Sequence, residues 1–210
     1  HTGGIADIQA WMMKTHPGFP VRVYGPASEA IPLVNQPLEG DETVALWPGI
    51  NARVLDVAGH TRGHLAYLVS GVAVCQPPAL FSGDLIFGLG CGRLFEGTAD
   101  QMYKALMRVA ALDADTRIYC AHEYTALNLP FALSVDPHNI ELMKRAERIR
   151  VLRQAGESTL PLSLEEELLT NPFLRSDQPA LTASVCADAQ AEPCRIFADL
   201  RRMRDSFKST

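Results

Sequence analysis

The sequence predicts an α/β domain followed by an all-helical region, and two observations support this fold class. Short apolar segments separated by turn signals recur between residues 21 and 120, with helical patterns before and among them. From about residue 136 onward, the segments have the three-to-four-residue spacing of amphipathic helices. We therefore predict two domains, residues 1–130 and residues 131–210, without a flexible linker between them.

The first helix is predicted from Ile5 to Lys14, because apolar residues recur there at helical spacing and His16-Pro17-Gly18 ends the pattern. Apolar runs bounded by turn residues predict the strands Val21–Gly25, Thr43–Trp47, Ala52–Ala58, Leu65–Ser70, Ala79–Phe81 and Arg117–Cys120. Capping residues and helical spacing predict further helices from Thr98 to Ala111, Glu123 to Leu133, His138 to Ala155, after the Ser163–Glu166 capping box, and Ile196 to Phe207.

Composition excludes several classes of protein. Of the 210 residues, 47% are hydrophobic, which is typical of a globular chain with a sizeable core. The net charge of −5 argues against a protein that wraps nucleic acid. No apolar run reaches the roughly 20 residues that span a bilayer, and no secretory leader opens the chain. We expect a cytoplasmic protein that binds neither nucleic acid nor membranes.

The cysteines do not indicate a disulfide framework or a thiolate zinc site, because their number is odd and no CxxC pair occurs. We interpret all five as reduced and mostly structural: Cys75, Cys91, Cys120, Cys186 and Cys194. One alternative stays open, because strand alternation places Cys120 on the same face as His122, which could act as its base.

Three predicted strands each lead to a residue type that binds metals. His60, Asp84 and His122 follow the strands that begin near residues 52, 79 and 117. Strand ends that point the same way would bring these side chains together, and neighbouring glycines would leave room for a ligand. Imidazole and carboxylate groups suit zinc, iron or manganese, and His1 is a fourth candidate ligand. Alternatively, each histidine could be a hydrogen-bonded turn residue and Asp84 a turn former or helix cap.

Longer motifs carry a more specific signal. The segments HTGG, GHTRGH, FSGDLIFGLGCGRLFEGTADQM, CAHEYTALN, LTNPFLR and RRMRDSF resemble the glyoxalase II (hydroxyacylglutathione hydrolase) family of the metallo-β-lactamase superfamily. The resemblance runs from one end of the chain to the other. It implies a metallo-β-lactamase-type αββα sandwich, incomplete at the N-terminus, and a helical C-terminal domain that binds the substrate. The sequence starts at His1, so we expect that the family's N-terminal segment, with three further ligands, is missing.

The resemblance also implies an activity and its cofactors. Family members hydrolyse the thioester S-D-lactoylglutathione to D-lactate and glutathione, a step in methylglyoxal detoxification. A hydroxide that bridges two divalent cations attacks the thioester carbonyl, and even one zinc ion lowers the pKa of bound water to about 7. We expect zinc, with iron or manganese as alternatives, in a monomeric enzyme. The rival hypotheses are a persulfide dioxygenase with one iron and a metal-poor binding module.

Motif-by-motif matching implies a role for nine residues. His1, His60, Asp84 and His122 correspond to metal ligands, and His60, Asp84 and His122 are also the predicted catalytic residues. Glutathione carries two carboxylates, so cations and hydrogen-bond donors are expected around it. The predicted substrate-binding residues are Arg93, Phe95, Tyr124, Arg201 and Arg204, the last two in an RxxK-type pattern with Arg in place of Lys. Asn128 could orient their neighbours.

Overall fold

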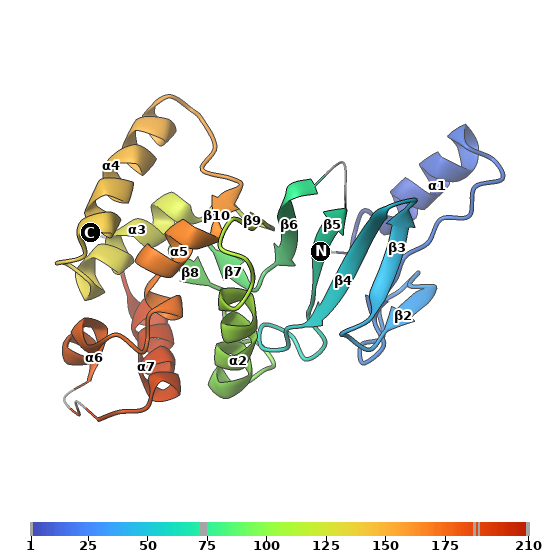
Figure 1. Cartoon of the computed structure of the whole chain (residues 1–210). Coiled ribbons are helices and arrows are strands. Elements are labelled where there is room, and N and C mark those ends of the chain that lie inside the picture. Colours follow the sequence, from blue (N-terminus) through green and yellow to red (C-terminus); the bar gives the residue numbers. More distant parts are fainter. Residues whose placement is uncertain (1, 72–74, 187, 189, 209–210) are drawn as a thin grey trace.

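The computed structural model describes residues 2–71, 75–186, 188 and 190–208, and its centre is a six-stranded sheet (Figure 1). The strand order is β10-β9-β6-β5-β4-β3. The strands are β3 (Thr43–Trp47), β4 (Ile50–Asp56), β5 (Leu65–Gly71), β6 (Cys75–Gly83), β9 (Arg117–Cys120) and β10 (Leu162–Ser163). Two small pairs lie outside this sheet: β1 (Tyr24–Pro26) with β2 (Gln36–Leu38), and β7 (Ile86–Phe87) with β8 (Gly90–Cys91).

The strand directions decide where the polar residues after each strand lie. Strands β3 to β6 form an antiparallel meander, and β6 pairs in parallel with β9 through the register Leu80↔Ile118. Strands β4 and β6 are both antiparallel to β5, so β4, β6 and β9 run the same way. Their C-terminal ends therefore reach the same edge of the sheet, as the sequence predicted.

One face of the sheet packs against α2. The helices are α1 (Ile5–Thr15), α2 (Ala99–Ala110), α3 (Thr125–Val135), α4 (Ile140–Gln154), α5 (Leu164–Thr170), η1 (Pro172–Leu174), α6 (Pro179–Val185) and α7 (Pro193–Ser206). Thr98 and Gln101 form a reciprocal capping box that starts α2. Met102 and Leu106 of α2 are fully buried and share a core cluster with Leu80 of β6.

Helices α3 to α7, which we call the helical region, lie at the β10 end of the sheet, opposite the end that carries β3 and α1 (Figure 1). Three phenylalanine rings pack together in this region. The ring centres of Phe131 and Phe173 are 6.0 Å apart, and those of Phe173 and Phe197 are 5.8 Å apart. The region predicted to be entirely helical also contains one short strand, β10, which pairs with β9. Ser163 ends this strand and also caps α5 by accepting a hydrogen bond from the Glu166 amide.

Most predicted elements are present, with small shifts at their ends. The helix predicted from Ile5 to Lys14 is α1, and the strand predicted from Val21 begins only at Tyr24. The predicted domain boundary near residue 130 falls within α3, and the division into two domains stays a prediction.

The opposite face of the sheet and the N-terminal helix expose apolar side chains. Phe81 of β6 and Tyr119 of β9 stack with ring centres 5.3 Å apart on this face, and both are more than 40% exposed. Helix α1 buries none of its residues. None of the helices in the described ranges combines the length and hydropathy that a membrane span requires.

Candidate active site

Three histidine and aspartate side chains meet where β4, β6 and β9 end. The His60 Nε2 atom lies 3.8 Å from Asp84 Oδ2, and His122 Nε2 lies 3.3 Å from Asp84 Oδ1. Each imidazole thus faces a different oxygen of the same carboxylate. Asp84 is buried, and both histidines are partly shielded from solvent. The structure therefore brings together the three residues that sequence reasoning selected from distant segments.

The orientation of His60 is fixed by a backbone group. Its Nδ1 atom lies 2.9 Å from the carbonyl oxygen of Arg93. A carbonyl oxygen only accepts hydrogen bonds, so Nδ1 carries a proton and donates it, and in a neutral ring Nε2 is the nitrogen that can bind a cation. A second hydrogen bond of this kind is the usual companion of a metal-binding histidine.

Two glycines allow the chain to come this close. Gly83 has φ +53°, and a Cβ atom there would lie 2.6 Å from the His64 ring. A Cβ atom on Gly92 would lie 2.0 Å from the carbonyl oxygen of Asp84 and 3.3 Å from His60 Nδ1. Any side chain at Gly92 would displace the backbone that holds the site.

The donor atoms fit divalent cations on either side of Asp84. Two ligands of one tetrahedral zinc, at about 2.0–2.2 Å from the metal, are separated by about 3.3–3.6 Å. The distance between His122 and Asp84, 3.3 Å, lies in this range, and the distance between His60 and Asp84, 3.8 Å, is slightly longer. Among the side chains that the structure describes, no group of three or more His, Cys, Asp and Glu residues is closed enough to hold an ion by itself. What is present is two histidine–carboxylate pairs that share Asp84. His1, the fourth predicted ligand, lies outside the described residues.

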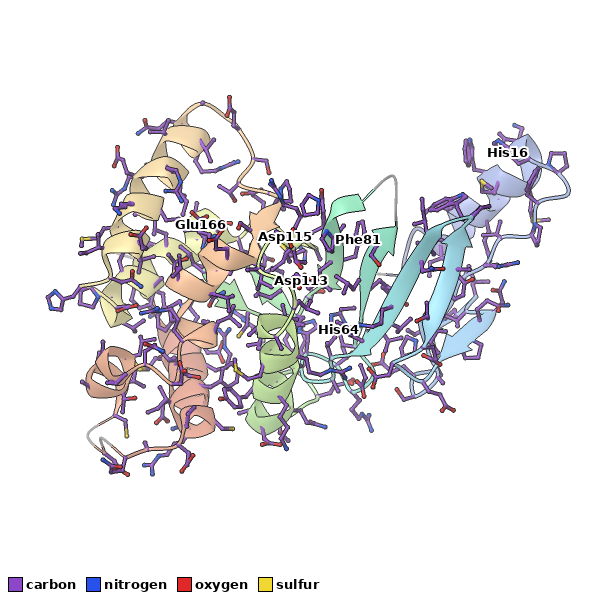
Figure 2. All side chains as sticks on the ribbon, viewed as in Figure 1. His16, His64, Phe81, Asp113, Asp115 and Glu166 are labelled. Carbon is purple, nitrogen blue, oxygen red and sulfur yellow. The ribbon has the colours of Figure 1, made fainter. Side chains whose placement is uncertain are left out.

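Two other histidines of the described ranges, His64 and His16, lie outside this group. His64 lies behind the site, where its Nε2 contacts the Ser82 carbonyl oxygen at 3.1 Å, and burial lowers its pKa. Sequence reasoning gave His64 no role, although it follows His60 in the same motif. His16, which the sequence predicted to end the first helix, caps the C-terminus of α1 far from His64 (Figure 2).

A cavity of about 460 Å³ opens beside the three donors. It lies between the sheet edge and the helical region, and its walls combine apolar and polar groups. All five predicted substrate-binding residues contribute to its lining: Arg93, Phe95, Tyr124, Arg201 and Arg204. The Tyr124 ring stacks on His122 with centres 4.8 Å apart, and the Phe95 ring lies 4.8 Å from the His60 ring.

The arginines of this cavity differ in what they already bind. Arg201 is 6% exposed and donates to the Cys91 carbonyl oxygen at 2.9 Å and to Asp205 at 2.8 Å. Arg204 contacts Asn128 Oδ1 at 3.2 Å, and burial, together with the charges of the two nearby arginines, lowers its pKa. Arg93 is largely exposed and lies 3.9 Å from Asp205. A crowded set of cations of this kind favours an anionic ligand.

The cysteines near the site are not activated. Burial raises the pKa of Cys91 to about 11, and it raises the pKa of Cys120 to about 11 as well. The Cys120 thiol donates to the His122 carbonyl oxygen at 3.3 Å rather than to its ring. Both thiols therefore stay protonated at neutral pH, which removes the alternative of a Cys120–His122 nucleophile.

Comparison with known proteins adds the family. Residues 123–207 match the family described as "Hydroxyacylglutathione hydrolase C-terminus". Two curated relatives named hydroxyacylglutathione hydrolase, from Halorhodospira halophila and Alkalilimnicola ehrlichii, are 46% and 47% identical to the chain over 209 residues. Each alignment covers 98% of this chain and 76% of the relative.

Solved structures show the same fold at lower identity. The chain is similar to ETHE1 from Myxococcus xanthus, with a TM-score of 0.55 and 19% identity over 94% of this chain and 61% of that one. It is also similar to a metallo-β-lactamase from Staphylococcus aureus, with a TM-score of 0.53 and 21% identity over 96% of this chain and 52% of that one. These likenesses show the metallo-β-lactamase fold.

Proposed function

The chain belongs to the hydroxyacylglutathione hydrolase family of thioester hydrolases, and we propose that its reaction takes place in the cavity beside His60, Asp84 and His122. The proposed reaction is the hydrolysis of S-D-lactoylglutathione to D-lactate and glutathione. The observation that carries this assignment is the shared carboxylate, since Asp84 presents one oxygen to each of two imidazole nitrogens at the cavity wall. The rival hypotheses of a dioxygenase or a binding module are not favoured.

The protein's contribution is to hold donor groups in fixed orientations. Asp84 would bridge two divalent cations, His60 would bind one of them and His122 the other. When bound, such cations supply the Lewis acidity that makes hydroxide available near neutral pH and stabilises negative charge on a carbonyl oxygen. The Arg93 carbonyl keeps His60 in the tautomer that can bind, and Tyr124 supports the His122 ring from one side.

The charges around the cavity match the substrate. Glutathione has two carboxylates, and the guanidinium groups of Arg93 and Arg204 are the cations best placed to bind them. Arg201 was predicted to bind substrate directly, but its NH1 and NH2 groups already bind Cys91 and Asp205. We propose that Arg201 instead holds Asp205 and the end of β8. Phe95 contributes an apolar wall, and a thiolate leaving group needs no strong general acid.

We further propose that the ions are zinc, with iron or manganese as alternatives, and that the protein is a cytoplasmic monomer. Nitrogen and carboxylate oxygen donors suit these ions. The free cysteines Cys91, Cys120, Cys186 and Cys194 are typical of a reducing compartment. Elemental analysis and size-exclusion chromatography with light scattering test the ion and the monomer.

The decisive experiment compares the substitution of two aspartates in the full protein. Asp84→Asn removes the shared carboxylate, so we expect the hydrolysis of S-D-lactoylglutathione and the bound metal to fall by at least about 100-fold. Asp115 lies exposed before β9 (Figure 2), and Asp115→Asn is the matched control, with activity and metal content unchanged.

A chelator supplies the second arm of this test. Removal of the metal should abolish hydrolysis, and re-addition of zinc should restore it. Hydrolysis that survives complete metal removal, or that is unaffected in Asp84→Asn, would overturn the proposal. A protein that binds the thioester without hydrolysing it would instead favour the binding module.

A further inference from the structure

We propose that Glu167 and Asn171 of the helical region are positioning residues for the reaction, because they hold the turn between β7 and β8 on which the metal-binding side chains depend. This inference rests on the proposed function and deepens it. Asp84 lies just before β7, and the carbonyl group that orients His60 lies just after β8. The two residues lie about 80 positions further along the chain and outside the cavity lining.

The turn has an unfavourable backbone at its centre. Leu89 has φ +59°, a left-handed conformation that glycine adopts readily and leucine rarely does. Its side chain is fully buried in a separate apolar cluster with Leu129 of α3 and Leu142 of α4. The turn is thus inserted into the helical region, which must provide the contacts that keep this conformation.

Side chains from α3, α5 and the start of η1 form a hydrogen bond to the backbone of each residue from 87 to 90. The Leu89 amide donates to Glu167 Oε2 at 3.0 Å. Asn171 Nδ2 donates to the carbonyl oxygens of Phe87 at 3.2 Å and Gly90 at 3.1 Å. The Gly88 carbonyl oxygen accepts from Asn128 Nδ2 at 3.0 Å.

The two holding residues are themselves fixed. Both Glu167 and Asn171 are fully buried, and Asn171 Nδ2 lies 2.9 Å from Glu167 Oε2. The Glu167 carboxylate is paired with Arg145, which also contacts Glu166 at 3.0 Å. A buried carboxylate that is paired and hydrogen-bonded has little freedom to move.

From the turn, contacts lead to each of the three donors. The Phe87 ring lies 6.0 Å from the His122 ring and 5.1 Å from the Tyr124 ring. The Gly92 amide donates to the Leu85 carbonyl oxygen at 3.0 Å, which closes the loop directly after Asp84. The carbonyl oxygen of the residue after Gly92, Arg93, accepts the hydrogen bond from His60 Nδ1. A shift of the turn would therefore move all three donors.

The test uses two asparagines that have the same local role. Asn171 caps η1 by accepting from the Phe173 amide, and Asn139 caps α4 by accepting from the Leu142 amide. Serine is an equally good cap, but it is too short to reach the carbonyl groups that the asparagine amides bind. Asn171→Ser therefore keeps the cap and releases the turn. Asn139→Ser is the matched control, since the Asn139 amide donates to Asp136 and the Leu169 carbonyl rather than to the turn.

Three measurements on the whole protein separate positioning from stability. For Asn171→Ser, we expect amide exchange of Leu89 in the metal-free protein to accelerate at least tenfold, the absorption spectrum of the cobalt-loaded site to change, and kcat to fall by about 10- to 100-fold. Asn139→Ser should lower the melting temperature by about as much as Asn171→Ser does. Its Leu89 exchange rate, cobalt spectrum and kcat should stay equal to those of the unsubstituted protein. Wild-type exchange, spectrum and kcat in Asn171→Ser would overturn the inference.

A second variant keeps the inference testable if Asn171→Ser does not fold. Glu167→Gln weakens the acceptor of the Leu89 amide, while Glu166 remains as a carboxylate partner for Arg145. It should change the same three measurements in the same direction, and unchanged values would count against the role of Glu167. The exchange measurement needs neither metal nor substrate, so it still tests the turn contacts if the unchanged protein proves unable to hydrolyse the thioester.

Discussion

The first and the last helix of the chain have similar sequence patterns and opposite environments. Helix α1 has apolar residues at helical spacing, yet it buries none of them, and Trp11 is 57% exposed. Helix α7 has the same kind of spacing, and its Ile196, Phe197 and Leu200 are fully buried. Helix α7 also contributes Arg201 and Arg204 to the cavity of the candidate active site.

This difference shows what an apolar face does and does not determine. Its spacing predicts that a segment is helical, because one side of the helix must leave water. Whether that side finds a partner depends on the rest of the fold. Helix α7 packs against η1 and α2 through Phe173 and Tyr103, both of which contact Phe197. The four substitutions below test this comparison, from the largest expected effect to the smallest.

Phe197→Ala should have the largest effect. The ring is fully buried and lies 5.8 Å from Phe173, so its removal leaves a cavity in the main core. We expect the free energy of unfolding to fall by about 3–5 kcal/mol, measured by chemical denaturation. A loss below 1 kcal/mol would mean that α7 is not packed as described.

Arg201→Met should have the next largest effect. Methionine fills much of the same space but leaves the Cys91 carbonyl without its guanidinium donor and removes the Arg201 partner of Asp205. The expected loss of stability is about 1–3 kcal/mol, with most of it from the buried carbonyl group. Since Arg201 already binds these partners, we expect KM to change less than it does for Arg204→Ala. A variant with unchanged stability and a strongly raised KM would restore the direct substrate contact that was first predicted.

Arg204→Ala should weaken substrate binding with little effect on folding. Its guanidinium group is only partly buried and contacts Asn128 at the cavity. We expect KM for the glutathione thioester to rise about tenfold, equivalent to about 1.4 kcal/mol, while kcat stays within about twofold. Steady-state kinetics checks this, with Arg195→Ala, on the same helix but outside the cavity lining, as the control. An unchanged KM would exclude Arg204 from the binding site.

Trp11→Ser should have the smallest effect on the 210-residue chain. The ring is exposed, and its one ring contact in the described structure is His16, with centres 5.7 Å apart. The expected change in the free energy of unfolding is within about 0.5 kcal/mol. A loss above about 1.5 kcal/mol would show that α1 has a partner, and the contrast with α7 would then disappear.

The sequence allowed the strand-end residues to be predicted, because each follows its own strand directly. Once β4, β6 and β9 run the same way, His60, Asp84 and His122 must reach one edge. The glycines beside them indicated close approach for the same local reason. The order of strands in the sheet was not predicted, because periodicity does not show which strands pair.

What sequence reasoning missed depends on contacts between distant segments. Leucine in a left-handed turn has no local signature, and the role of Asn171 is visible only when β7 and β8 are placed beside it. Arg201 was predicted from its motif to bind substrate, which stays a prediction, but the motif does not show that its NH1 and NH2 groups donate to Cys91 and Asp205. Strand β10 is two residues long and too short for any periodic pattern.

The main chain and the side chain of Arg93 have different roles, so a substitution at this position affects them differently. The group that orients the imidazole belongs to the main chain, so it is retained whichever side chain stands at position 93. The guanidinium group at that position, in contrast, extends toward the solvent side of the cavity. Substitutions there can alter which acyl donors are accepted while the chemistry at His60 is inherited unchanged.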